Sequence, residues 1–297
     1  MPVAPKNQDK LGSFRALGVH FTRQEGDNHI GDCPLCGKEN KFNVHSESTK
    51  WQCWSCQAGG NSTSFVEQLW ERLDAETTEY KSIADSRNLY FPETAITWGL
   101  VYSHSLQCWL VPGYNILGEV KQLYRYQKVN KRMLLLPTPT LGHQLFGVNL
   151  YDKRKPIVDL CEGPWDAMVL WELLAHGKMV EVNGKSTIQQ TASTTHSLAS
   201  DRNVLAAPGC KVFKPEWCSL FAGKVVNLYY DNDHPITQKD GTQRIVGGYA
   251  GLQRVAEMLQ QSSDPPKEIN YKRWGSKGYT PTLPNGTDVR DLLTGAV

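Results

Sequence analysis

The sequence predicts an α+β protein of several domains, and three regional patterns support this expectation. The first region holds two close pairs of cysteines, and the middle region holds short β-type runs broken by glycine and proline. The last region alternates strand-like and helix-like runs, which indicates a mainly parallel sheet. A length of 297 residues suits two or three domains.

The first domain is expected at residues 1–75, and a polar linker that moves relative to its neighbours is expected at residues 76–88. Apolar residues at helical spacing from Phe65 to Leu73 predict a helix that closes the first domain. Ser64 and, three residues later, Glu67 predict the capping box that opens this helix.

Two further domains are expected at residues 89–151 and 152–297. Strands are predicted in the second domain at Cys108–Pro112 and Gly118–Tyr126. The third domain is predicted to contain, in chain order, the strand Ile157–Glu162, the helix Pro164–Ala175, the strand Lys224–Tyr230, the helix Gly248–Gln261 and the strand Ile269–Trp274.

The paired cysteines form the most specific motif in the chain. Two residues separate Cys33 from Cys36 and Cys53 from Cys56, and sixteen residues lie between the pairs. Each pair can occupy a tight turn that points both sulfurs at one ion, so the spacing predicts the structural zinc site of a zinc ribbon. The other cysteines are expected to be small buried residues, namely Cys108, Cys161, Cys210 and Cys218.

A zinc ribbon can be purely structural, or it can bind a partner. Cations and aromatic rings lie inside or beside the cysteine loop, and such side chains bind the unstacked bases of single-stranded nucleic acid. This composition favours the binding role. The residues concerned are Lys38, Lys41, Phe42, His45, Lys50, Trp51 and Trp54.

The net charge of +2 does not by itself indicate nucleic acid, but the local distribution of charge is informative. The segment 120–151 contains no Asp or Glu, and two tyrosines, Tyr124 and Tyr126, lie among its cations. This pattern predicts a basic surface formed by Lys121, Arg125, Lys128, Lys131 and Arg132.

Acidic residues follow the predicted strands of the last domain. Glu162 ends one strand, with Asp166 in the next helix, and Asp231 and Asp233 follow another strand. Ligand-binding groups collect at the carboxyl ends of parallel strands, so both acidic groups are expected to face one crevice. Clustered carboxylates select Mg²⁺ or Mn²⁺, which would hold nucleotide phosphates there.

No run of residues approaches the ~18–20 apolar residues that a membrane span requires. The first ten residues are polar and include proline, unlike a signal peptide. We therefore expect a cytoplasmic location, or the host cytoplasm if the protein is viral, and no membrane partner.

Together these motifs resemble those of DnaG-type and phage DNA primases. Four segments of this chain resemble the primase zinc ribbon: 33–36 (CPLC), 41–44 (KFNV), 51–56 (WQCWSC) and 59–61 (GGN). The amino-terminal half of the primase RNA polymerase core is resembled by Leu89–Thr94, Pro112–Tyr114, Gly118 and Leu145–Gly147. Its TOPRIM half is resembled by Glu162–Asp166 and Asp231–Asp233. The joint pattern covers nearly the whole chain in the family's order.

The resemblance implies a zinc ribbon followed by a primase core that ends in an α/β TOPRIM domain with a mainly parallel sheet. It implies synthesis of short RNA primers from ribonucleoside triphosphates on a single-stranded DNA template. Glu162 would bind metal or take a proton from the attacking hydroxyl, and Asp231 and Asp233 would bind two Mg²⁺ or Mn²⁺ ions. Asp288 and Asp291 resemble a later acidic pair of the family, and Asp288 is a further candidate metal ligand. Template and nucleotides would bind the five cations of the basic segment together with Lys41, Trp51 and Trp54.

Three features depart from the family pattern. Many cellular DnaG-type ribbons have a histidine where this chain has Cys36, whereas some phage primases have an all-cysteine set like this one. The segment His234–Arg244 looks like an insertion before Gly247. The chain ends at Val297, so we expect a minimal primase or a fragment of a larger protein. A virus or mobile element is the expected source, and a helicase or polymerase is an expected partner in trans.

Two other functions use the same residues. A TOPRIM nuclease would hydrolyse DNA with these acids, although the primase-like ribbon and middle domain argue against it. A catalytically silent zinc-ribbon module would bind single strands for a partner protein, although the intact acids argue against that. Incorporation of nucleotides separates a primase from both alternatives, and strand cleavage identifies the nuclease.

Overall fold

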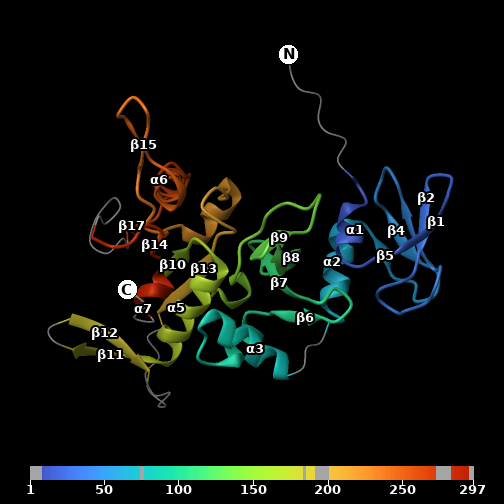
Figure 1. Cartoon of the computed structure of the whole chain (residues 1–297), viewed down its shortest axis with the longest axis horizontal. Helices are drawn as coiled ribbons and strands as arrows, with labels where there is room; N and C mark the ends of the chain where they lie inside the picture. Colours follow the sequence, from blue (N-terminus) through green and yellow to red (C-terminus); the bar gives the residue numbers. More distant parts are fainter. Residues whose placement is uncertain (1–8, 74–76, 183–184, 191–200, 272–281, 294–297) are drawn as a thin grey trace. The chain divides into compact units, whose positions relative to one another are not determined.

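The fold is described by a computed structural model that covers residues 9–73, 77–182, 185–190, 201–271 and 282–293 (Figure 1). The chain forms two compact units, each built from segments that are separated in the sequence. The first unit comprises Met1–Glu79, Gly99–Tyr114 and Val120–Gln144, and the second comprises Tyr80–Trp98, Asn115–Glu119 and Leu145–Val297. No helix in the described ranges is both long and apolar enough to cross a membrane.

The first unit begins with an antiparallel sheet of five strands, paired in chain order. The polypeptide folds back at each successive turn, so each strand pairs antiparallel with the next strand along the chain. The strands are β1 (Phe21–Glu25), β2 (Asn28–Gly31), β3 (Phe42–His45), β4 (Trp51–Cys53) and β5 (Gly59–Gly60).

An aromatic core holds this sheet against two helices, α1 (Gly12–Ala16) and α2 (Ser62–Trp70). Phe65 of α2 lies 5.0 Å from the ring of Phe14 in α1 and 5.5 Å from the ring of Trp51 in the sheet. Trp51 in turn stacks on Phe42 at 5.1 Å. Rings this close contribute packing energy beyond simple burial, which explains how a small ribbon can be stable.

Helix α2 begins two residues before the predicted cap. Its N-cap is Asn61, whose side chain accepts the backbone N–H groups of Thr63 and Ser64, while the Ser64 hydroxyl accepts the N–H of Asn61. The predicted Ser64–Glu67 capping box is therefore wrong, because an earlier asparagine already satisfies the free N–H groups. Glu67 instead forms an ion pair with Lys121.

The middle of the chain forms a second antiparallel sheet in the first unit, which confirms the strands predicted there. Asn130 and Lys131 connect its last two strands and both adopt positive φ, 48° and 67°. Two such residues form the tight hairpin turn that matches the twist of antiparallel strands. The strands are β6 (Val101–Ser103), β7 (Cys108–Tyr114), β8 (Val120–Val129) and β9 (Arg132–Pro137).

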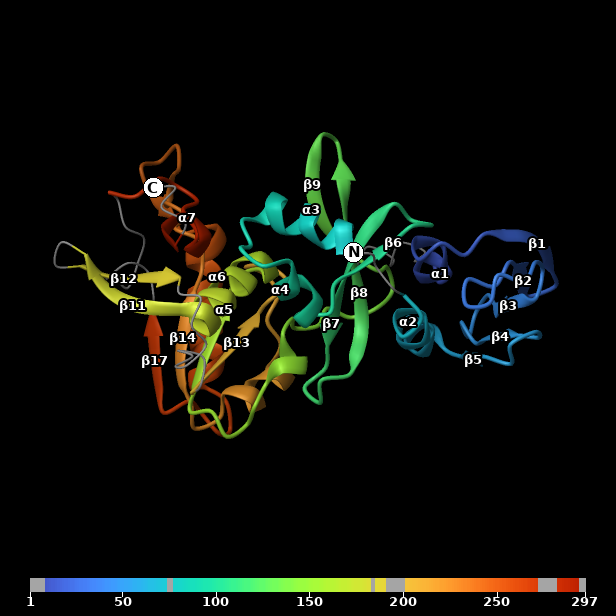
Figure 2. The same ribbon diagram turned by 90° about the horizontal axis from the view of Figure 1, so that it is seen from below.

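The second unit is centred on a parallel sheet of four strands in the order β13-β10-β14-β17. Three of these strands, β13, β14 and β17, are labelled in Figure 2. All three strand pairs are parallel, which confirms the prediction made from the strand and helix alternation. The strands are β10 (Ile157–Cys161), β13 (Arg202–Ala206), β14 (Val225–Tyr229) and β17 (Glu268–Tyr271). The predicted fold class, an α+β protein ending in an α/β unit with a mainly parallel sheet, is thereby confirmed.

Helices and small hairpins complete this unit. The two predicted helices are present as α5 (Pro164–His176) and α6 (Gly247–Gln260). The other helices are α3 (Thr77–Arg87), which begins in the first unit, α4 (Pro92–Thr97) and α7 (Val289–Leu293). Two hairpins are present, β11 (Gly177–Val182) with β12 (Lys185–Gln190), and β15 (Ile236–Thr237) with β16 (Gln243–Arg244). Two 3-10 turns lie at Val148–Leu150 and Pro215–Phe221.

The predicted linker is largely a helix. Within 76–88 the structure has α3, whose residues Tyr80, Ile83 and Ala84 are buried. These three positions follow the i, i+3, i+4 spacing of an amphipathic helix, a signal that the polar composition of the segment conceals. Three apolar residues thus bury one face of this helix, and the expected movement of the segment relative to its neighbours stays a prediction.

The two compact units group the chain differently from the three consecutive domains and the linker predicted from composition, whose boundaries stay a prediction. The sheet β6–β9 belongs to the same unit as the ribbon, whereas α4, which lies next to it in sequence, belongs to the second unit. In that unit, the buried carboxylate of Glu172 in α5 accepts the N–H groups of Tyr90 and Phe91 at 2.8 and 2.7 Å. What each predicted domain does stays a prediction.

Candidate functional site

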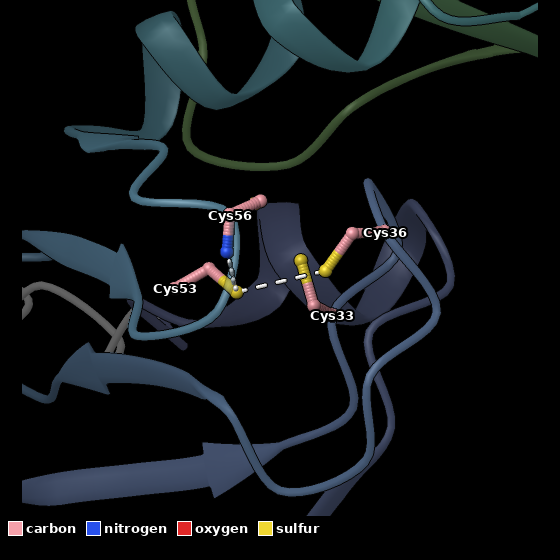
Figure 3. Close-up of side chains that lie close together, drawn as sticks. All are labelled: Cys33, Cys36, Cys53 and Cys56. Carbon is pink, nitrogen blue, oxygen red and sulfur yellow. Dashed lines mark hydrogen bonds between the residues drawn. The ribbon is translucent and has the colours of Figure 1, made fainter.

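The four paired cysteines lie together at one end of the ribbon (Figure 3). Their sulfur atoms are all within 4.8 Å of one another, and Sγ of Cys36 is 3.8 Å from Sγ of Cys53. Four sulfurs placed tetrahedrally at about 2.3 Å from a zinc ion would be about 3.8 Å apart. The donor set and this spacing fit a structural Zn²⁺ ion, as predicted.

Each cysteine pair occupies a tight backbone turn. The N–H of Gly37 donates to the carbonyl of Cys33 at 2.8 Å, and the N–H of Gln57 donates to the carbonyl of Cys53 at 2.9 Å. Gly37 and Gln57 both follow the second cysteine of their pair, and both adopt a positive φ, 69° and 60°. Glycine suits the first turn, whereas the second turn holds a glutamine in a conformation that the sequence does not reveal.

Hydrogen bonds prepare one thiol to bind metal. Burial opposes ionisation of Cys53, but N–H groups of Cys56 and Ser55 point at its sulfur from 3.5 and 3.4 Å. These donors, together with the neighbouring thiols, lower the pKa of Cys53 to about 7. Zinc binds thiolates, so the second turn favours the form of the ligand that the ion requires.

The unpaired cysteines take no part in this site. Burial raises the pKa of all of them above the ordinary range, and for Cys210 to about 11. Cys108, Cys161 and Cys218 are buried as predicted, and Cys210 is half-buried.

One face of the ribbon sheet carries a groove of about 560 Å³, lined by both polar and aromatic side chains. Asn43 of β3 and Gln52 of β4 are directly opposite each other in register. Both residues are half-buried, and within the described ranges their side-chain amides form no hydrogen bond. The groove has no acidic residue in its lining, which includes Asn28, Asn43, His45, Lys50, Gln52 and Trp54.

The two tryptophans of the ribbon differ in exposure. Trp54 is 59% exposed at the edge of this groove, so a base can stack on its indole. Trp51 is only 3% exposed, and its indole N–H donates to the carbonyl of Asn61 at 2.8 Å. Its ring belongs to the aromatic core between sheet and helices, and Trp51 also lines this groove, so its contact with bases stays a prediction.

The predicted basic surface is concentrated at the tip of one hairpin. Lys128, Lys131 and Arg132 are exposed around the turn between β8 and β9, and Arg125 is half-buried further along β8. Lys121 is engaged by Glu67, as described above. Lys41 of the ribbon is exposed and lines a second groove with Trp54.

The acidic residues follow the two central strands of the parallel sheet, between which the order of strand addition reverses. From β10 the chain continues to β13 on one side, and from β14 it continues to β17 on the other side. The crevice between two such strands, at their carboxyl ends, is where open α/β sheets bind ligands. Glu162 follows β10 and Asp231 closely follows β14, and the N–H of Asp231 lies 3.3 Å from Oε2 of Glu162.

Backbone contacts fix the remaining acids around this crevice. The N–H of Gly248, at the start of α6, donates to Oδ2 of Asp233 at 2.6 Å. The buried Asn232 pairs with Thr287, its N–H donating to the carbonyl of Thr287 at 2.8 Å. This pairing places the next residue, Asp288, near Asp231. The sequence motifs missed Gly248, although a Gly-Gly pair at a helix start indicates close packing.

A single arginine joins two of these acids. Nε of Arg290 donates to Oδ1 of Asp166 at 2.6 Å, and the same guanidinium pairs with Asp288. Asp288 and Asp291 cap α7 reciprocally, with N–H to carboxylate distances of 3.0 and 3.1 Å. Asp288 thus lies near the other acids, and both members of the late acidic pair form contacts within the protein, while the role of Asp288 as a metal ligand stays a prediction.

Burial and electrostatic repulsion both disfavour negative charge among these acids. Burial raises the pKa of Asp231 to about 9, with the charges of Glu162, Asp166, Asp288 and Asp233 acting in the same direction. Burial also raises the pKa of Asp166 to about 7, although Arg290 opposes this shift. A bound cation would remove this repulsion, so the oxygen donors fit Mg²⁺ or Mn²⁺ in chemistry and charge.

The acidic set is less compact than the cysteine set. Across the described ranges, the four cysteines are the one group of three or more His, Cys, Asp or Glu residues whose ligand atoms gather closely enough to hold a metal ion. The structure places Glu162 and Asp233 near enough to act electrostatically on Asp231, while the crevice and the roles of these acids as metal ligands stay a prediction.

Comparison with known proteins identifies the ribbon. Residues 16–95 match the CHC2 zinc finger family, the zinc ribbon of DnaG. This segment is a DnaG-type zinc ribbon. An 86-residue segment is 33% identical to a DNA primase of Halalkalibacterium halodurans and covers 29% of this chain and 13% of that protein. The predicted resemblance to DnaG-type primases is thereby confirmed, and the aligned part is a small fraction of the curated relative.

Solved primase structures cover most of the chain at low similarity. The zinc-binding and RNA polymerase domains of the Aquifex aeolicus primase share 16% identity and a TM-score of 0.46, covering 96% of this chain and 80% of that one. The primase fragment of the bacteriophage T7 primase-helicase protein shares 15% identity and a TM-score of 0.43, covering 90% and 94%.

Proposed function

We propose that this protein is a DNA primase, which makes short RNA primers on single-stranded DNA from ribonucleoside triphosphates. The main support for the proposal is that one chain contains both a DnaG-type zinc ribbon and a parallel sheet with two neighbouring acids. These acids, Glu162 and Asp231, lie close together after the two central strands, where the order of strand addition reverses. A ribbon that selects a template and a carboxylate crevice that handles phosphates are the two parts such a reaction requires.

The ribbon groove supports template binding. Asn43 and Gln52 offer amides that can pair with base edges, because an amide donates and accepts side by side. Trp54 offers a ring for stacking, and Lys50 and Lys41 offer charge for the phosphates. The absence of acidic residues from the groove lining suits a polyanionic ligand.

The exposed cations at the β8–β9 hairpin tip provide a second contact for the template or for nucleotides. Lys128, Lys131 and Arg132 are grouped within one turn and its flanking residues. Contacts of this kind fix the position of a strand without reading its sequence. Each phosphate neutralised in this way steepens the salt dependence of binding.

The acidic crevice would hold the reacting groups, in what we interpret as a TOPRIM site. Glu162, Asp231 and Asp233 would hold Mg²⁺ or Mn²⁺, which when bound would neutralise the triphosphate and the charge that develops during transfer. Glu162 would accept the proton of the attacking hydroxyl through a carboxylate oxygen. The new phosphodiester bond forms as pyrophosphate leaves, so the protein contributes mainly position and charge.

Other proteins of replication are expected partners. One solved relative is the bacteriophage T7 lagging-strand DNA polymerase interacting with primase domains bound to an RNA/DNA hybrid. We propose by analogy that a helicase or polymerase acts with this chain in trans, delivering template or receiving the RNA primer.

Primer synthesis on single-stranded DNA of mixed sequence tests this function. Labelled ribonucleotides are supplied with Mg²⁺ or Mn²⁺ to the zinc-loaded wild type and to Asp231→Asn. We expect short RNA products from the wild type and at least a hundredfold less from the variant. DNA cleavage without incorporation would indicate the nuclease instead, and single-strand binding with neither activity would indicate the silent ribbon module.

A further inference from the structure

A hairpin begins and ends beside the acidic cluster of the second unit. Asp233 precedes it in the sequence and Gly248 follows it, and the N–H of Gly248 donates to Oδ2 of Asp233 at 2.6 Å. This bond brings the two ends of the intervening segment together, so the segment is a loop closed at its base. The loop contains β15 and β16 and is the part of the chain that looks like an insertion. In Figure 1 it extends beyond α6 and away from the parallel sheet.

Contacts with the segment before α7 anchor the base of this hairpin. The N–H of His234 donates to Oδ1 of Asn285 at 2.7 Å, and Nε2 of His234 lies 3.0 Å from the carbonyl oxygen of Leu283. Toward the tip, the N–H of Gln238 donates to the carbonyl of Thr242 at 2.8 Å, which continues the pairing of the two strands. The hairpin is therefore directed from the acidic cluster as one element.

The outer part of the hairpin does not belong to the core. Every residue from 236 to 245 is exposed. The exposed residues include two large apolar side chains, Ile236 at 51% and Ile245 at 39%. Burial of apolar surface therefore does not account for this segment, and its side chains are accessible to a ligand.

The charges of the hairpin favour a polyanionic ligand. Lys239 lies in the loop at the tip, and Arg244 lies in β16, where it pairs in register with Ile236. Asp240 is the one acid between 236 and 245, and its Oδ1 accepts the N–H and the hydroxyl of Thr242 at 3.0 and 2.6 Å. The two cations are separated by about 10 Å along the hairpin, so they can contact different phosphates of one strand.

Two further cations flank the acids near the base of the hairpin. Lys211, in the loop after β13, and Arg254 of α6 are exposed, and the guanidinium of Arg254 donates to the carbonyl of Cys210. Burial and the charges of Glu162 and Asp233 raise the pKa of the Cys210 thiol, so this loop lies beside the acidic cluster. A nucleic acid whose reacting end is at the acids would meet exposed cations there and again along the hairpin.

We propose that this hairpin is an arm that binds the RNA–DNA hybrid as it leaves the acidic cluster, with Lys239 and Arg244 in contact with its phosphates. The inference rests on the proposed function and adds a product-binding element to the same site. A paired hybrid is favoured over single-stranded template because the segment 236–245 contains no aromatic residue on which an unpaired base could stack. Contacts from cations alone suit a duplex, whose bases are already stacked inside it.

The test measures binding of a preformed RNA–DNA hybrid to the zinc-loaded full chain by fluorescence anisotropy, at fixed Mg²⁺ and over a series of salt concentrations. Lys239→Gln combined with Arg244→Gln is expected to weaken hybrid binding about tenfold at low salt. It should also lower the slope of log affinity against log salt by about two units, since each phosphate contact contributes about 0.9. Binding of single-stranded DNA should stay within about twofold of the wild type, because the ribbon is unchanged.

Lys153→Gln combined with Arg154→Gln is the matched control. It removes the same charge from two exposed residues that precede β10, at the opposite edge of the parallel sheet from the hairpin. We expect this control to bind the hybrid as the wild type does. An equal loss in the control would overturn the proposal, because the effect would then come from net charge alone.

Wild-type affinity and salt slope in the hairpin variant would also overturn the proposal, and would leave a protein partner as the ligand of the hairpin. Equal losses of hybrid and single-strand binding would overturn it too, because the hairpin would then hold template. The two levels of inference fail in different ways. A wild type that makes no RNA removes the primase function, whereas a wild type that makes primers, with normal hybrid binding by the hairpin variant, removes only the arm.

Discussion

The backbone of Gly248 packs directly against that of Asp231. A Cβ atom added at Gly248 would lie 2.6 Å from the carbonyl oxygen of Asp231 and 2.7 Å from Oε2 of Glu162. Two acids from neighbouring strands and the start of α6 therefore meet at a point that leaves no room for a side chain. This contact helps to set how close the two acids can lie.

Gly248→Ala should consequently impair the acidic crevice. We expect a loss of about 1–3 kcal/mol in unfolding free energy and at least a tenfold loss of primer synthesis, because the contacted atoms include backbone that cannot rotate away. Chemical denaturation and the primer assay measure these effects. Gly241→Ala is the control for activity, since a Cβ there meets nothing within 4 Å; its φ of 82° strains an alanine, so it should lose about 1–2 kcal/mol of stability but keep full activity. Equal activity of Gly248→Ala and wild type would show that this packing is not critical.

The stability of the metal-free protein should depend on pH through Asp231. Its folded pKa is raised to about 9, so the folded state keeps a proton that the unfolded state loses above about pH 4. Stability is therefore expected to fall as pH rises from about 4 to 9. Thermal unfolding from pH 5 to 9 should show this slope, and Asp231→Asn should reduce it. Added Mg²⁺ should stabilise most at high pH, and an identical slope in wild type and variant would contradict the assignment.

Removal of zinc should unfold the ribbon. Cys53→Ser is expected to reduce bound zinc from about one ion per chain to near zero, because three thiolates no longer close the tetrahedral site. Metal analysis and the circular dichroism of the chain report this loss. Cys218→Ser changes a buried thiol outside the site and should keep its zinc. Full zinc content in Cys53→Ser would exclude the four-cysteine site.

The two ribbon tryptophans should respond differently to truncation. Trp54→Ala is expected to weaken binding of single-stranded DNA by about 1–3 kcal/mol with little effect on stability, because its exposed ring can stack on a base. Trp51→Ala should destabilise the ribbon by about 3–5 kcal/mol, because it empties the aromatic core. Fluorescence anisotropy and denaturation measure the two effects. Unaltered DNA affinity in Trp54→Ala would remove it from the binding surface.

The sequence determined what depends on local order and spacing. The cysteine pairs predicted the zinc site because two short turns suffice to gather four sulfurs. The apolar runs predicted β10, α5, β14 and α6 to within one or two residues, since burial on both faces of a parallel sheet leaves a continuous pattern. The same order placed Glu162 and Asp231 at the carboxyl ends of their strands.

Only the tertiary structure decided which side chains are used by the fold and which are left for a ligand. Trp51 and Trp54 are three residues apart, yet one completes an aromatic core and the other is exposed. Asp288 pairs with Arg290, and α3 docks through three apolar residues in a polar segment. Spacing along the chain cannot reveal these outcomes, because burial and ion pairing depend on residues brought together from distant positions.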